Sequence, residues 1–345
     1  METEVVSVVL AAGRGSRMPS DDLNKVCYEI ADVPAISRAL EVYEQSGVTR
    51  HIVVVGHLAD QVRAEVESRR SNVEFAHQPE PKGTGHAARC GAKPLQERDY
   101  QGAVLLVAGD KVLRREVVSD LIAAMREENA DLVFLTGDKR DNPGSGRVLK
   151  NEQGEPIAIV ETAEIALSRL LVELEEIVAL GASVPVAQIL QRMKAHFPKE
   201  SKLQKACPGL LQLISTRSEV QPELLSSEVS GLKPKAEITV YREGRQQTIR
   251  AHEVEEVTDE VNLSVYVFNS TALYEALETL QPANAQGEEY LTDCIKYLAS
   301  SCREDGRQRF CLKTVKLDDP RACMGFNTLE ELQKIREYYS ELGDN

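Results

Sequence analysis

The first half of the chain alternates short runs of β-branched and aliphatic residues with longer amphipathic stretches. Runs at 5–10, 51–56, 73–78, 103–107 and 131–136 have the length of buried strands, whereas 34–46, 58–70, 84–93 and 116–128 carry apolar residues at helical spacing. Strands that alternate with helices predict an α/β fold with a mostly parallel sheet covered on both faces. Ligands of such sheets bind outside the carboxyl ends of the strands.

From about residue 165 the pattern changes. Apolar residues at helical spacing over 167–178 and 184–197 predict two helices. The stretch 218–235 is rich in Ser, Glu and Pro and has the composition of a linker, and 236–254 alternates polar and apolar residues around a central glycine, as a β-hairpin does. We therefore expect 165–255 to be a helix-plus-hairpin insertion.

Size and charge restrict the class of protein. The 345 residues are enough for roughly two domains, and 41 Lys and Arg against 55 Asp and Glu give a net charge of −14. Such a surface is unsuited to broad contact with nucleic acid or an anionic membrane, so we expect neither partner. The sequence has no apolar run of membrane-spanning length and no secretory leader, which predicts a cytoplasmic protein. Seven cysteines without a C-x-x-C pair predict reduced thiols.

The first predicted strand runs into a glycine-containing loop, LAAGRGSRM at 10–18. Glycines let backbone N–H groups approach a ligand closely, and Arg14 and Arg17 add positive charge, so the loop is typical of phosphate binding; a tight structural turn is the alternative. Met18 stands where the dinucleotide motif needs its third glycine, and the P-loop motif is absent from the sequence. The loop therefore predicts a different mode of phosphate binding.

Three further segments carry candidate residues. Lys25 could add a cation to a triphosphate site or be an ordinary solvated lysine. Gln78 ends a strand, and its carboxamide matches the edge of a pyrimidine; the glycines at 83–85 open a helix and would let a base lie against backbone. Asp110 follows the strand at 103–107, where a carboxylate beside phosphates suits Mg²⁺. The alternative is that Asp110 only caps the local structure.

Two other patterns bear on the chemistry. Asn327 precedes the predicted last helix, with Glu330 three residues later, so it could be the N-cap of a capping box. The six histidines form no H-x-x-x-H pair, and no G-x-S-x-G motif is present. Zinc hydrolysis and serine-nucleophile chemistry are therefore poorly supported.

Taken together, the order and spacing of these motifs resemble the sugar-1-phosphate nucleotidylyltransferases, most closely the uridylyltransferase domain of the bifunctional N-acetylglucosamine-1-phosphate uridylyltransferases. The resemblance covers about 4–164 and 256–342, and it rests on LAAGRGSRM, Lys25, HQPEPKGTGHA, AGD, GSGRV, IVE, EVN, NAQGEEYLTD and GFN. It implies a Rossmann-like mixed sheet formed by 1–164 and 256–345 and interrupted by the 165–255 insertion, which has no counterpart in that family. It does not extend to an acetyltransferase domain, so acetyl transfer is not implied.

The resemblance also implies roles for individual residues. It assigns the nucleoside to Leu10, Ala12 and Gly13, and the uracil to Gln78, Gly83 and Thr84. It assigns the triphosphate and catalysis to Arg17, Lys25 and Asp110, and Mg²⁺ to Asp110 and Asn327. The sugar is assigned to Gly146, Glu161 and Asn262. The implied reaction is Mg²⁺-assisted, in-line transfer of a uridylyl group from UTP to a sugar 1-phosphate, with release of pyrophosphate.

The acceptor and the role of the insertion stay open. The expected acceptor is N-acetylglucosamine 1-phosphate; the alternatives are thymidylyl or uridylyl transfer to glucose 1-phosphate, or a non-catalytic nucleotide-sensing subunit. Ala108 stands where the most similar members of the family often have an aromatic residue. The insertion could be a packed subdomain, a lid, a partner-binding module or a contact within a homo-oligomer.

Overall fold

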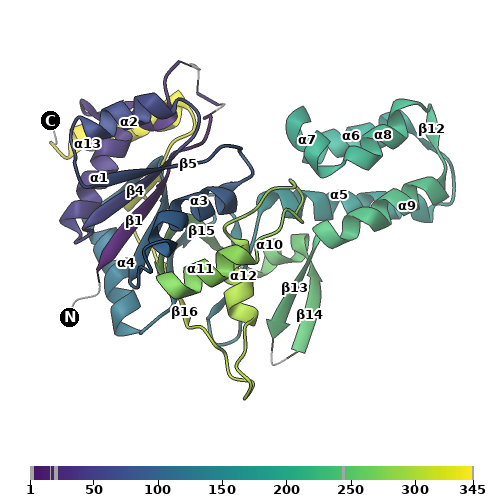
Figure 1. Ribbon diagram of the computed structural model, residues 1–345. Helices are drawn as coiled ribbons and strands as arrows, with labels where there is room; N and C mark the ends of the chain where they lie inside the picture. The colour runs from purple at the N-terminus through teal and green to yellow at the C-terminus, as the bar shows by residue number, and fades with distance from the viewer. Residues whose placement is uncertain (1–3, 16, 19–21, 243–244, 344–345) are drawn as a thin grey trace.

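A computed structural model describes residues 4–15, 17–18, 22–242 and 245–343. Within these residues nine strands form a mixed central sheet, in the order β10-β9-β15-β6-β1-β4-β5, with β8 paired to β15 and β16 (Figure 1). The strands are β1 (Val5–Leu10), β4 (Arg50–Val55), β5 (Val73–His77), β6 (Ala103–Ala108), β8 (Leu132–Asp138), β9 (Arg147–Lys150), β10 (Pro156–Val160), β15 (Glu260–Asn269) and β16 (Leu312–Lys316). The predicted α/β fold is confirmed.

Parallel pairing dominates one half of the sheet. Strand β1 pairs in parallel with both β4 and β6, and β4 pairs in parallel with β5. Strand β15 runs antiparallel between β6 and β8, with an irregular register between Asn262 and Tyr266. The five strands expected from the first half are present, whereas β15 and β16 bring residues from beyond 255 into the same sheet.

Helices cover both faces of the sheet. Residues of β1 alternate between two apolar clusters: Val5 and Val9 face one, and Val6 and Val8 face the other, as strand geometry requires. The first cluster includes residues of α1 (Ala35–Gln45), α2 (Ala59–Glu67) and α4 (Arg115–Glu127). The second includes residues of α3 (Thr84–Gln96), α11 (Ser270–Glu278) and α12 (Asp293–Ser300). The last helix, α13 (Leu329–Glu341), packs against the short strands β2 (Glu29–Ile30) and β17 (Cys323–Gly325).

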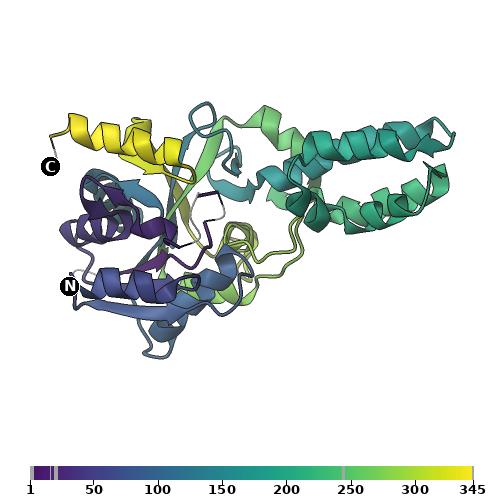
Figure 2. The same ribbon diagram turned by 90° about the horizontal axis from the view of Figure 1, so that it is seen from above.

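The segment that follows β10 is mostly helical and projects to one side of the sheet (Figures 1 and 2). It contains α5 (Thr162–Ala179), α6 (Val186–His196), α7 (Glu200–Ala206), α8 (Pro208–Ser215) and α9 (Pro222–Leu232), with β11 (Val184–Pro185) paired to β12 (Glu219–Val220). These elements enclose an apolar cluster of their own. Because α5 begins at Thr162, residue 165 falls within its first turn.

The linker predicted at 218–235 is wrong. The residues form β12, α9 and a 3-10 turn, and Leu225, Val229 and Leu232 of α9 are buried in the cluster of the helical segment. Pro222 occupies the first turn of α9, where a missing N–H costs nothing. Composition alone suggested a linker because the exposed face of this helix carries its serines and glutamates.

The predicted hairpin is confirmed as β13 (Glu237–Arg242) and β14 (Arg245–Arg250). Ile238 and Val240 of β13 pack with Ile157 and Val160 of β10, so the hairpin covers apolar surface at the edge of the central sheet. A short helix, α10 (Val254–Val257), then leads into β15. Among the described residues, no helix combines the length and apolar character needed to cross a membrane.

Candidate active site

A cavity of about 340 Å³ lies where β1 ends. We call it the glycine-loop cavity. The sequence-predicted residues that line it come from four separate segments: Leu10, Ala12, Gly13, Lys25, Gln78, Gly83, Thr84 and Asp110. Both β1 and β6 end here, so the cavity lies at the carboxyl edge of the parallel strands, where the alternation of strands and helices predicts a ligand.

Lys25 and Asp110 line one side of this cavity, and Asn327 and Arg17 join them through hydrogen bonds without lining it. Lys25 Nζ forms an ion pair with Asp110 Oδ2 and donates to Asn327 Oδ1 at 3.1 Å, and Arg17 Nη2 donates to the same Asn327 oxygen at 2.7 Å. The Lys25 and Asp110 side chains are only 14% and 18% exposed. Lys25 also passes beside Gly15, which has a φ of +61° and no room for a larger residue without displacing the lysine. Segments more than 300 residues apart therefore converge on one charged cluster.

The cluster has donor chemistry that fits Mg²⁺. The Asp110 carboxylate and the Asn327 amide oxygen are hard ligands of the kind this ion prefers, and both already approach a single positive charge, the Lys25 ammonium. Mg²⁺ usually takes one or two protein ligands and completes its shell with water and substrate phosphates. Two protein oxygens beside a phosphate-binding loop therefore suffice, although no group of three or more His, Cys, Asp or Glu side chains capable of holding a metal occurs within the described ranges.

Asn327 is not the N-cap of the last helix. Helix α13 begins at Leu329, its cap is Thr328, and the Thr328 hydroxyl accepts a hydrogen bond from the Glu331 backbone N–H at 3.2 Å. The cap thus lies one residue later than Asn327, and the Glu331 carboxylate accepts from the Asn327 N–H rather than completing a capping box. This register leaves the Asn327 side chain pointing to Arg17 and Lys25 rather than to the helix.

Gln78 and the glycines after it are tightly held. Gln78 Nε2 lies 3.2 Å from the Gly83 carbonyl oxygen and 3.1 Å from His86 Nδ1, and these contacts fix the plane of its carboxamide. Gly83 has a φ of +112°, and a Cβ there would lie 2.4 Å from the Glu289 carbonyl oxygen. The Gly85 N–H donates to that same oxygen at 2.8 Å, and the Leu291 N–H donates to Thr84 Oγ1 at 3.2 Å. The glycines therefore dock the start of α3 onto the segment 284–292.

A second cavity, of about 230 Å³, adjoins the first and shares Leu10, Thr84, Ala108 and Glu288 with it. We call it the Glu161 cavity. Glu161 and Asn262 line it, and Gly146 lies beside them: its carbonyl oxygen accepts from the Asn262 N–H at 2.9 Å, and a Cβ on Gly146 would meet Ile159 at 2.8 Å. The structure thus brings together the three residues that the resemblance assigned to the sugar.

Buried polar groups surround the Glu161 cavity. Glu161 caps α5, and Thr292 Oγ1 donates to Glu161 Oε1 at 3.0 Å. Burial raises the pKa of Glu161, while the hydrogen bond from Thr292 opposes the rise. Asn262 Nδ2 donates to the Tyr266 hydroxyl at 2.7 Å, and Asn262 Oδ1 accepts from the Ser264 N–H at 3.0 Å. Both Asn262 and Glu161 therefore have structural partners as well as an exposure to the cavity.

Sequence reasoning did not single out several residues that line the Glu161 cavity, among them Ser264, Tyr266, Glu288 and Tyr290. Ser264 has a φ of +60° at the irregularity of β15, a conformation that the sequence of a strand does not predict. Glu288 and Tyr290 fall inside the NAQGEEYLTD motif, so the motif itself was the available indication.

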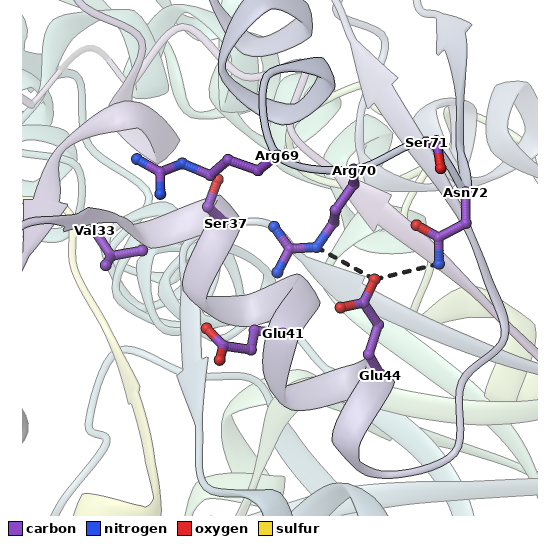
Figure 3. A pocket seen from close by; sticks show the side chains of 8 residues that line it. All are labelled: Val33, Ser37, Glu41, Glu44, Arg69, Arg70, Ser71 and Asn72. Atoms are coloured by element: carbon purple, nitrogen blue, oxygen red, sulfur yellow. Dashed lines mark hydrogen bonds and ion pairs between the residues drawn. The ribbon is translucent and has the colours of Figure 1, made fainter.

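A third cavity, of about 450 Å³, lies along α1 and the segment between α2 and β5, away from the glycine loop. Figure 3 shows Arg70 and Asn72 directed toward Glu44: Arg70 Nε lies 3.3 Å from Glu44 Oε1, and Asn72 Nδ2 donates to the same oxygen at 3.2 Å. None of the residues that line this cavity belongs to the segments that the sequence singled out for ligand binding, so it is a weaker candidate for nucleotide binding than the glycine-loop cavity.

Glu44 also completes a Ser–His–Glu arrangement. Ser7 Oγ lies 2.7 Å from His51 Nδ1, and His51 Nε2 lies 3.4 Å from Glu44 Oε1. Ser7 and His51 are at most 1% exposed, so no substrate can reach the hydroxyl. Burial lowers the pKa of His51 to about 4, and the group is thus a neutral, structural contact between β1 and β4.

Comparison with known proteins identifies the family of the chain. The family model of the MobA-like NTP transferase domain matches residues 7–290, which include both cavities up to Tyr290. The chain belongs to this family. It is a nucleotidyltransferase, and the mixed sheet with its flanking helices is the fold on which that activity is built.

The chain is similar to several proteins named bifunctional protein GlmU. It is 28% identical to that of Mycolicibacterium gilvum over 96% of this chain and 49% of the relative, and 24% identical to that of Pelotomaculum thermopropionicum over 97% and 52%. Identity with the protein of Pelobacter propionicus is 39%, over 46% of this chain and 34% of the relative. Over the two long matches, the chain spans about half the length of the relative. The protein is thus a nucleotidyltransferase of the MobA-like family that is similar to part of the proteins named GlmU.

Proposed function

We propose that the protein transfers a uridylyl group from UTP to a sugar 1-phosphate, with N-acetylglucosamine 1-phosphate as the preferred acceptor. The observation that carries this proposal is the cluster of Arg17, Lys25, Asp110 and Asn327 beside the glycine-loop cavity, next to a second cavity with its own polar residues. Two adjoining cavities suit a reaction that joins two substrates, and the two cations beside the first cavity would neutralise the charge of a triphosphate bound there.

The chain's own residues act by position and charge. In this proposal the glycine loop holds the nucleoside, the fixed Gln78 carboxamide contacts the uracil, and Arg17 and Lys25 neutralise the triphosphate. A phosphate oxygen of the acceptor attacks the α-phosphorus in line, so the protein needs no nucleophile, and its contribution is orientation and electrostatic stabilisation. Asp110 and Asn327 would hold Mg²⁺, which supplies charge neutralisation at the phosphoryl oxygens when bound.

For the acceptor, we assign the sugar to the Glu161 cavity. Glu161 and Asn262 offer a carboxylate and an amide that can bond hydroxyl and amide groups. Gly146 lies beside them, where a side chain would press on Ile159 and Glu161. We further propose that 1–164 and 256–345 form the transferase unit and that 165–255 is a subdomain. The apolar cluster enclosed by α5–α9 supports this division, and Ala285 from outside the segment also packs into that cluster.

The test crosses UTP, dTTP, CTP and GTP with N-acetylglucosamine 1-phosphate, glucose 1-phosphate and related sugar phosphates, and it measures pyrophosphate release. We expect the fastest release from UTP with N-acetylglucosamine 1-phosphate, and loss of release when Mg²⁺ is chelated. Preference for dTTP or for glucose 1-phosphate would redirect the proposal to that pair. Nucleotide binding without release for any pair would instead support a sensing subunit.

A further inference from the structure

The helical segment 165–255 reaches back to the active site through α7. In Figure 1 this helix lies at the end of the segment that faces the core. Lys205 Nζ, on α7, forms an ion pair of 2.6 Å with Glu288 Oε1, and Glu288 lines both the glycine-loop cavity and the Glu161 cavity. Ala285, three residues earlier, is fully buried in the apolar cluster of the helical segment. The segment 284–292 is therefore held by the projecting helices as well as by α3.

The charge of the Glu161 cavity is unsuited to a phosphate. Its described lining includes the carboxylates Glu161 and Glu288, and none of those lining residues is Lys or Arg. Among the projecting helices, α7 carries Lys205, which contacts Glu288 of this cavity. Burial raises the pKa of Glu161, and the charges of Lys202, on α7, and of Arg147, on β9, oppose the rise. Lys202 and Lys205 are three residues apart and share one face of α7.

We propose that α7 supplies the counter-charge of the Glu161 cavity, with Lys205 as a binding residue for the phosphate of the sugar 1-phosphate. This inference rests on the proposed function, because it assumes an acceptor phosphate in that cavity. Glu288 holds Lys205 at the cavity in the absence of substrate. The Lys205 and Glu288 side chains are 51% and 31% exposed, and pairs so exposed contribute little to stability, so Lys205 can exchange Glu288 for a phosphate of higher charge.

A purely structural role for the pair makes a different prediction. If Lys205 only ties the projecting helices to the segment 284–292, then removing either charge breaks the same contact, and Lys205→Gln and Glu288→Gln have the same effect. If Lys205 provides counter-charge, the two substitutions have opposite effects on phosphate binding, because one removes the cation and the other removes a competing anion.

The experiment measures the dissociation constants of N-acetylglucosamine 1-phosphate, glucose 1-phosphate and inorganic phosphate by calorimetry on the full chain. Variants are Lys205→Gln, Glu288→Gln and the double substitution, with Lys194→Gln as the matched control: an exposed lysine of α6 that lines neither cavity. We expect Lys205→Gln to weaken binding of the probes roughly threefold to tenfold at low salt, Glu288→Gln to strengthen it, and Lys194→Gln to change it little. Urea unfolding of each variant reports whether the fold is kept.

The inference would be overturned if Lys205→Gln and Glu288→Gln changed the dissociation constants in the same direction. It would also be overturned if Lys205→Gln bound the probes as tightly as Lys194→Gln, or if the wild-type protein bound none of the probes. The proposed function is tested separately by pyrophosphate release from the wild-type protein. A protein that binds the phosphate probes in a Lys205-dependent way but releases no pyrophosphate would uphold the counter-charge and refute the transferase activity on these acceptors.

Discussion

Replacing Gly83 by alanine should disrupt the active site more than any other glycine substitution of comparable size. A Cβ at this position would lie 2.4 Å from the Glu289 carbonyl oxygen and 3.0 Å from the Glu289 nitrogen, both of them backbone atoms. Ordinary contact needs about 3.4 Å, so the segment 284–292 would have to retreat by about 1 Å. The φ of +112° with a ψ of 176° is a conformation that essentially only glycine adopts. Strain and overpacking together should cost about 2 to 5 kcal/mol.

The matched control is Gly287→Ala, in the same segment. Gly287 has a φ of +62°, but a Cβ there meets nothing within 4 Å, so only backbone strain of about 1 kcal/mol is expected. Urea unfolding gives the stabilities, and pyrophosphate release gives turnover. A displacement of about 1 Å beside the reacting groups should lower turnover of Gly83→Ala about 100-fold. If Gly83→Ala were as stable and as active as Gly287→Ala, the account of the docked segment would be refuted.

Three further predictions test other parts of the structure. Lys25→Gln should lower turnover about 100-fold or more while circular dichroism stays unchanged, because it removes preorganised charge; near-normal pyrophosphate release would refute the site. Burial raises the pKa of Glu164 from 4.5 to about 8. Between these pH values the folded protein keeps the Glu164 proton and the unfolded chain releases it, so the free energy of unfolding falls as the pH rises from about 4.5 to 8. Glu164→Gln should therefore unfold at higher urea than the wild type at pH about 9 and at similar urea at pH about 4, whereas equal midpoints at both would contradict the shift. Leu225→Ala should lower the free energy of unfolding by about 2 to 5 kcal/mol, because the Leu225 side chain on α9 is fully buried, whereas Leu224→Ala, at a neighbour that is 43% exposed, should change it little. A small loss of stability in both variants would support a linker at 218–235 instead of a packed helix.

The sheet could be predicted from local pattern because its parallel strands are buried on both faces and are therefore continuous apolar runs. Strand β1 matches its expected bounds, 5–10, and α1 and α4 lie within one residue of theirs. The prediction of a linker at 218–235 was wrong because it relied on the composition of the segment and not on the spacing of its apolar residues. Leu225, Val229 and Leu232 recur at helical intervals after Pro222, and this pattern was available in the sequence.

The site divides in a similar way. The glycine loop, Gln78 and Asp110 could be predicted because each follows a recognisable strand. The contact of Gly83 with Glu289 and the pair of Lys205 with Glu288 join residues about 200 and 80 positions apart, and no local pattern specifies such contacts. The sequence offered Asn327 as one candidate cap of the last helix, and the cap of α13 is Thr328; both residues have a glutamate three positions later and so satisfy the same capping pattern.

The most direct test of the central claim follows the α-phosphate of the nucleotide. The protein is incubated with Mg²⁺, N-acetylglucosamine 1-phosphate and UTP radiolabelled in the α-phosphate, and the products are separated. We predict that the label appears in a UDP-sugar in equal amount to the pyrophosphate released, and that Lys25→Gln suppresses both products together. Label in UMP, or release of orthophosphate without a labelled sugar nucleotide, would contradict nucleotidyl transfer to a sugar phosphate.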